Sequence, residues 1–132
     1  MQKFLLVAAG GAIGAAARYG MSSFVTRLAP VEFPYGTLSV NVTGAVFMGI
    51  AWAVFSSAAK PAVGAELFLM IGAIGAFTTF STYSQEIFSM LQLRDYGKAA
   101  GYALANNVLS VACVFASYYA CMRFFRMSGG DL

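Results

Sequence analysis

The chain has 132 residues, of which 60% are hydrophobic and 10% charged, whereas soluble domains average roughly 45–50% and about 25%. This composition disfavours a soluble enzyme. At about 20 residues per transmembrane helix, the length predicts four spans in a single transmembrane domain, residues 1–132. The net charge of +3 comes from Lys and Arg residues that stand singly between apolar blocks, so we expect no nucleic-acid partner.

Four apolar blocks predict an all-α membrane protein with spans at about 4–25, 36–55, 66–93 and 99–124. The first block follows Lys3 and also resembles a secretory signal, but its cleavage would leave only three spans, so we favour a retained helix. Prolines and short polar runs mark the turns between blocks. These turns contain Pro30 and Pro34, then Lys60 and Pro61, and then Arg94 to Lys98.

Positive charges are almost evenly divided between the two sides of a four-span chain. One side carries Lys3, Lys60, Arg123 and Arg126, and the other carries Arg27, Arg94 and Lys98, with Arg18 close to the second group. Orientation in a membrane follows the bias of such charges. The near balance predicts a dual-topology protein that pairs as an antiparallel homodimer; the alternative is one orientation set by another feature. Gly10 and Gly14, and also Gly97 and Gly101, have the spacing of close helix packing.

Two polar side chains at membrane depth stand out in the first two blocks. Arg18 either lies on an ion pathway or extends to the membrane interface. Asn41 has an amide that can donate two hydrogen bonds to an anion without carrying a charge. A hydrogen bond between helices is an equally good interpretation of Asn41.

The third block contains the run 75–85, in which Gly72, Gly75 and the threonines that follow weaken a helix. We expect a break there that frees backbone carbonyls for an ion or a cavity. Near a two-fold axis such carbonyls would suit a small hard cation. Phe80 and Tyr83 share a helix face, where their ring edges can face an anion, although ordinary aromatic packing is the simpler explanation of the pair.

The fourth block carries a neutral polar stripe. It consists of Tyr102, Asn106, Asn107 and Ser110. No carboxylate is expected near the centre of a span, because Glu66 and Glu86 are predicted in the flanking turns of the third. A cation-coupled exporter or proton relay needs a buried carboxylate, whereas neutral donors and one Arg suit an anion that must exchange its hydration for hydrogen bonds.

The sequence resembles the Fluc (CrcB-type) fluoride channel family along essentially its whole length. The resemblance is carried by Gly10–Gly14 with Arg18 and Tyr19, by Gly36–Asn41, and by Gly75–Ser84. It implies a non-enzymatic, multi-pass protein of a microbial inner or plasma membrane that assembles as an antiparallel dimer. Two pores would export fluoride passively and so reduce its toxicity inside the cell.

Position by position, the resemblance also implies roles for individual residues. The pore asparagine corresponds to Asn41 and the first pore phenylalanine to Phe80, while Tyr83 stands where the family usually has Phe. Other pore positions correspond to Tyr102, Asn106 and Ser110, and a vestibule arginine to Arg18. A structural sodium ion, Na+, at the dimer interface would be held by backbone carbonyls of Gly75 and Thr78.

Two other function classes share this length and span count. In a dual-topology small multidrug exporter we would expect a carboxylate in the middle of the first span, where this chain has only Ala, Gly, Ile and Arg18. A non-transporting assembly subunit would tolerate apolar replacements of its deep polar residues.

Overall fold

The computed structural model describes residues 1–29, 32–58 and 62–127, and in these ranges all regular structure is helical. Four segments are long and apolar enough to cross a membrane: Gln2–Leu28, Tyr35–Ser57, Val63–Gln92 and Tyr96–Met127. The four predicted spans are therefore confirmed, with ends that differ by one to three residues. The predicted turn residues Pro30, Lys60 and Pro61 lie outside the described residues.

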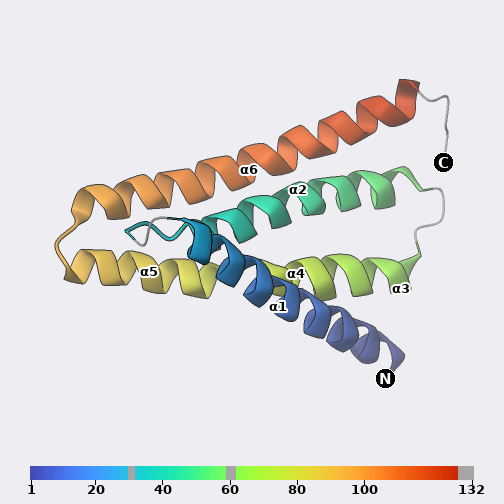
Figure 1. Cartoon of the computed structure of the whole chain (residues 1–132). Helices are drawn as coiled ribbons and strands as arrows, with labels where there is room; N and C mark the ends of the chain where they lie inside the picture. The colour runs from blue at the N-terminus through green and yellow to red at the C-terminus, as the bar shows by residue number, and fades with distance from the viewer. Residues whose placement is uncertain (30–31, 59–61, 128–132) are drawn as a thin grey trace.

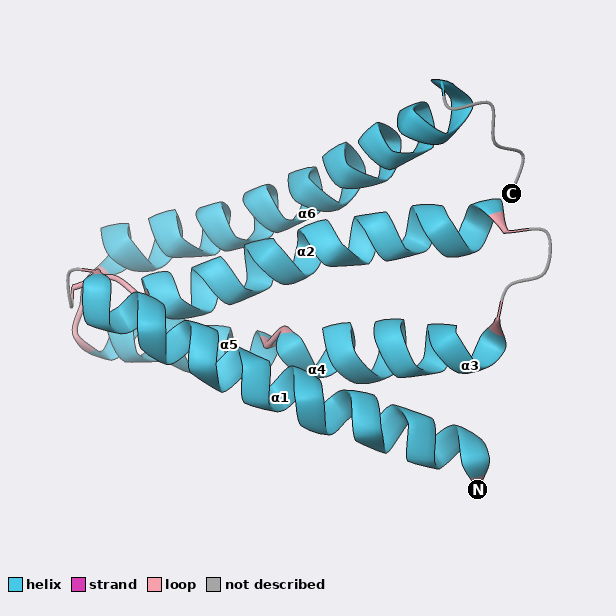
Figure 2. Ribbon diagram, turned by 45° about the vertical axis from the view of Figure 1, so that its right-hand side comes forward, coloured by secondary structure: helices cyan, strands magenta, loops and turns pink. Residues whose placement is uncertain are grey.

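The first, second and fourth segments are the single helices α1 (Gln2–Leu28), α2 (Tyr35–Ser57) and α6 (Tyr96–Met127). Helix α6 runs alongside α2, and α1 crosses the third segment obliquely (Figure 1). The turned view in Figure 2 shows the same arrangement, with α1 in front of the third segment.

The third segment is divided into several helical pieces. A short α3 (Val63–Glu66) continues into the π-helix η1 (Leu67–Ile74) and the single turn α4 (Gly75–Phe77), and α5 spans Phe80–Gln92. Between α4 and α5, Thr78 and Thr79 have extended backbones, with ψ angles of 158° and 117°. We call these two residues the extended pair; Figure 2 draws them as a loop. The hydroxyl of Thr79 accepts a hydrogen bond from the N–H of Thr82 (3.2 Å) and so caps α5.

Helix α1 contacts η1 through glycines. A Cβ atom at Gly14 would overlap the carbonyl of Ala73, and one at Gly10 would overlap that of Phe68. Backbones approach this closely only where side chains are absent, so the predicted packing of the first glycine pair is confirmed. Gly97 and Gly101 make no such contact in the single chain, because a Cβ at either position would meet no atom of the described residues within 4 Å.

Large apolar side chains point away from the chain rather than into a core. Among many, Phe24, Phe47, Trp52 and Phe115 are more than half exposed. Val40 and Tyr102 are the largest side chains that are fully buried in the described residues. Large apolar side chains on the exterior are the arrangement expected of a protein surrounded by lipid.

Gly14→Ala is expected to destabilise the fold by about 1–3 kcal/mol, because its new methyl group overlaps the Ala73 carbonyl. Gly20→Ala, in the same helix, is the matched control: a Cβ there meets nothing within 4 Å, and Ala is the better helix former by about 1 kcal/mol. Thermal unfolding of the detergent-solubilised protein measures both. Equal midpoints for the two variants would contradict the close packing of α1 on η1.

Candidate functional site

Asn41 in α2 binds both backbone polar groups of Thr79. Its Oδ1 accepts from the N–H of Thr79 (2.8 Å), and its Nδ2 donates to the carbonyl of the same residue (3.1 Å). The same Nδ2 also donates to Oδ1 of Asn106 in α6 (3.0 Å). Both amide hydrogens of Asn41 are thus engaged within the chain. The interhelical hydrogen bond that we considered for Asn41 is present, and it stabilises the extended pair.

Five of the residues predicted to line a pore surround one cavity of about 300 Å³, which we call the asparagine cavity. They are Asn41, Phe80, Tyr83, Asn106 and Ser110. The extended pair and Asn107 complete its polar lining.

Two hydrogen-bonding groups at this cavity are buried and have no partner in the described chain. They are Nδ2 of Asn106, a residue that is only 5% exposed, and Oγ of Ser110. A buried donor without an acceptor costs about 1–3 kcal/mol. Such groups at a cavity indicate a bound species that accepts hydrogen bonds, or water.

Phe80 and Tyr83 lie together, with ring centroids 5.4 Å apart, but they differ greatly in exposure. Phe80 is 75% exposed at the outer surface of the chain, whereas Tyr83 is 7% exposed. The hydroxyl oxygen of Tyr83 accepts a hydrogen bond from Nδ2 of Asn107 (2.7 Å). The predicted aromatic pair therefore exists, and one of its rings carries a polar group into the chain.

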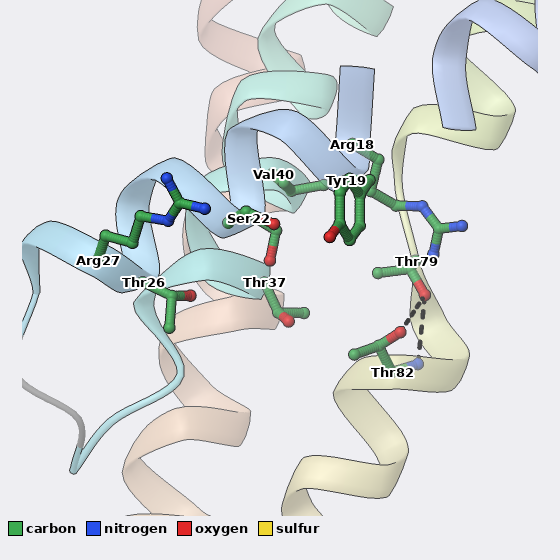
Figure 3. Close-up of a pocket in the computed structure, with 10 residues that line it drawn as sticks. Arg18, Tyr19, Ser22, Thr26, Arg27, Thr37, Val40, Thr79 and Thr82 are labelled. Atoms are coloured by element: carbon green, nitrogen blue, oxygen red, sulfur yellow. Dashed lines mark hydrogen bonds between the residues drawn. The ribbon is translucent and has the colours of Figure 1, made fainter. Parts of the chain in front are cut away.

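Arg18 lines a different cavity, of about 520 Å³, which we call the arginine cavity (Figure 3). The guanidinium of Arg18 extends toward Thr79, and its buried Nε has no partner in the described residues. The other lining residues are Tyr19, Ser22, Ser23, Thr26, Arg27, Thr37, Val40, Thr79 and Thr82. Two arginines, six hydroxyl groups of Ser and Thr and no carboxylate give this cavity a positive potential. Thr79 lines both cavities.

The prediction that Glu86 lies in a flanking turn is wrong. It lies inside α5, and its carboxylate accepts hydrogen bonds from the hydroxyls of Thr37 (2.7 Å) and Tyr102 (2.6 Å). Tyr102, predicted at the pore, is fully buried and binds Glu86 instead of lining the asparagine cavity. Glu86 follows Tyr83 by three residues and so shares its helix face, a spacing that could have identified it.

Glu86 also lines a third cavity, of about 420 Å³, together with Glu32. This cavity shares Ser22, Thr26, Thr37 and Thr82 with the arginine cavity. The charge of the lining therefore changes sign along one continuous hydroxyl-rich surface, from arginine near Thr79 to glutamate beyond Thr82.

Gly75 begins α4, three residues before Thr78 of the extended pair. The N–H of Thr79 would bond to the carbonyl of Gly75 in a continuous helix, but it donates to Asn41 instead. The hydroxyl of Thr78 approaches the Gly75 carbonyl at 3.4 Å, and Gly75 is exposed. In the described residues no three His, Cys, Asp or Glu side chains are grouped to hold a metal ion, so a cation here would need backbone oxygens.

Comparison with known proteins gives a consistent result. A family model described as CrcB-like protein, Camphor Resistance (CrcB), matches residues 5–118. A protein of Caulobacter sp. (strain K31) named fluoride-specific ion channel FluC is 42% identical over 129 residues, which is 96% of this chain and 100% of the relative. Relatives of the same name from Phenylobacterium zucineum (strain HLK1) and Paracoccus denitrificans (strain Pd 1222) are 41% and 42% identical, over 95% and 86% of this chain and 99% and 89% of their own lengths.

Asn41→Ala is expected to lower the free energy of unfolding by about 3 kcal/mol, because it leaves both backbone groups of Thr79 and Oδ1 of Asn106 without their partner. Ser39→Ala is the control, since the Ser39 hydroxyl bonds only to the Tyr35 carbonyl of its own helix. Thermal unfolding in detergent compares the two. If both variants had the same unfolding midpoint, Asn41 would not be the link between α2 and the third segment.

Proposed function

Because this chain belongs to the CrcB-like protein family, we propose that it is a fluoride-specific ion channel that lets fluoride leave the cell down its gradient and so limits fluoride toxicity. Its multi-pass architecture fits a microbial inner or plasma membrane. A channel of this kind catalyses no covalent reaction.

The observation that carries this proposal is the pair of unpartnered groups at the asparagine cavity, Nδ2 of Asn106 and Oγ of Ser110. A small anion loses a large hydration energy when it enters protein, so its path must supply hydrogen-bond donors in place of water. Uncharged donors do this without holding the ion too tightly to leave. The electropositive ring edges of Phe80 and Tyr83 add to the same environment.

The arginine cavity is the proposed entrance. Arg18 and Arg27 raise the local concentration of anions, and Thr79 connects this cavity with the asparagine cavity. Glu32 and Glu86 give the adjoining third cavity the opposite charge, which disfavours an anion there. The charge distribution thus directs the anion past Thr79 and toward Asn106 and Ser110.

We place two such chains in an antiparallel homodimer with dual topology. The almost even division of positive charge in the sequence supports this arrangement. So does the single chain itself: Phe80 lines the asparagine cavity but is largely exposed, and Gly97 and Gly101 lie open on the surface. A second copy would cover these groups and close the pathway.

We also propose a structural sodium ion at the dimer interface, held at the extended pair by the carbonyls of Gly75 and Thr78. The Gly75 carbonyl fits this role because it has lost its helical N–H donor and belongs to an exposed residue. Oxygen ligands suit a small hard cation, and its charge would stabilise carbonyl oxygens from two chains at close range. We assign this structural role to the extended backbone of Thr78 and Thr79, in the segment where the sequence predicts a helix break.

Ser110→Ala is expected to slow fluoride efflux from proteoliposomes about tenfold, the effect of one lost hydrogen bond to an ion. Stability should not fall, because the hydroxyl has no partner in the described chain. Ser117→Ala in the same helix is the control, since its hydroxyl bonds to the Cys113 carbonyl of α6. Unchanged fluoride efflux in Ser110→Ala, or equal efflux of chloride from the unmodified protein, would contradict the selective pore.

Growth in lipophilic cations, tested beside growth in fluoride, separates this function from multidrug export, and the efflux assay separates it from an assembly subunit.

Purification in a bulky organic cation instead of sodium is expected to weaken the dimer and lower its thermal unfolding midpoint, because the interface carbonyls then repel one another. Size-exclusion chromatography at equal ionic strength measures the change, and returning sodium should reverse it. A dimer indifferent to the cation would remove the role assigned to Gly75 and Thr78.

A further inference from the structure

Tyr83 places a hydroxyl group beside Asn107 at the lining of the asparagine cavity. The residue is 7% exposed and lines the cavity together with Asn107, which its hydroxyl contacts. Tyr has the same ring as the Phe that the resemblance leads us to expect here, but its O–H can donate one hydrogen bond and accept others. The direction of that donor decides what the hydroxyl can bind.

Asn107 determines this direction. Its Nδ2 donates both to the hydroxyl oxygen of Tyr83 (2.7 Å) and to the carbonyl of Ala103, one turn earlier in α6 (2.8 Å). The second bond orients the amide so that it presents a hydrogen, not an oxygen, to Tyr83. The phenol oxygen is therefore an acceptor toward Asn107, and its own proton must point elsewhere.

The hydroxyl of Tyr83 donates no hydrogen bond within the part of the chain that the structure describes; its one bond there is accepted from Asn107. The open space beside it is the asparagine cavity, where Nδ2 of Asn106 and Oγ of Ser110 also have no partner. Asn106 is itself 5% exposed. Three polar groups from α5 and α6 thus border one cavity with unused hydrogen-bonding capacity, as expected around a species that only accepts hydrogen bonds.

We propose that Asn107 is a positioning residue that aims the hydroxyl proton of Tyr83 into the asparagine cavity, where Tyr83 donates a hydrogen bond directly to fluoride. This inference rests on the channel function proposed above. It assigns to the second aromatic position of this chain a hydroxyl donor in addition to a ring edge. Because fluoride is smaller than chloride and accepts stronger hydrogen bonds, a donor held in one direction favours fluoride over chloride.

The test compares fluoride efflux from proteoliposomes holding the unmodified protein, Tyr83→Phe, Asn107→Ala and the double variant, over a range of fluoride concentrations. Tyr83→Phe removes only the hydroxyl and should raise the half-saturating fluoride concentration about tenfold, as expected for one charge-assisted hydrogen bond. Asn107→Ala should raise it in the same direction by a smaller factor, because the hydroxyl remains but is no longer oriented. Tyr119→Phe, on the exposed outer face of α6, is the control for loss of a phenol hydroxyl.

The double variant separates positioning from a general structural role. If Asn107 acts through the Tyr83 hydroxyl, adding Asn107→Ala to Tyr83→Phe should cause no further change. A further loss in the double variant, or an unchanged half-saturating concentration in Tyr83→Phe, would overturn the inference while leaving the channel function intact. Failure of the unmodified protein to conduct fluoride would instead overturn the channel function and this inference with it.

Discussion

The hydrogen bonds between Asn41 and the backbone of Thr79 are the interaction on which the site depends. An extended residue inside a transmembrane segment leaves an N–H and a carbonyl without helical partners, and lipid offers no water to replace them. Asn41 supplies both partners from α2 and reaches Asn106 in α6 with its remaining hydrogen. One amide thereby joins three transmembrane segments at the same depth. It also places Thr79, which is 8% exposed, between the arginine cavity and the asparagine cavity.

The glycine contact between α1 and η1 explains why a cavity opens on one side of Thr79. Gly10 and Gly14 bring the first half of α1 against the third segment, and the helix then continues at an oblique angle (Figure 1). Arg18 and Ser22 follow one and two turns after Gly14 and line the arginine cavity. The close contact at Gly10 and Gly14 and the arginine cavity beyond it thus both result from the crossing of α1 and the third segment.

The sequence predicted the set of polar residues at this site better than it predicted their partners. Hydropathy was sufficient to predict four helices long enough to cross a membrane. Five of the residues predicted to line a pore do line one cavity. Glu86 was misplaced because hydropathy treats a carboxyl group as too costly for a span, whereas in the fold two hydroxyls from α2 and α6 bind it. Tyr102 was assigned to the pore from the resemblance and from its place in the polar stripe of the fourth block, and neither shows which neighbouring helix its hydroxyl meets.

The sequence by itself determined the number and length of the transmembrane helices, the near balance of charge across the membrane, and the presence of uncharged donors at depth, because each depends on the order of residues along one segment. Only the tertiary structure decided which donors keep a partner. Asn41 binds Thr79 and Asn106, Tyr102 binds Glu86, and the hydroxyl of Ser110 has no partner among the described residues. These outcomes require side chains from different helices to meet at hydrogen-bond distance, and that depends on helix crossings and on the rotation of each helix about its axis.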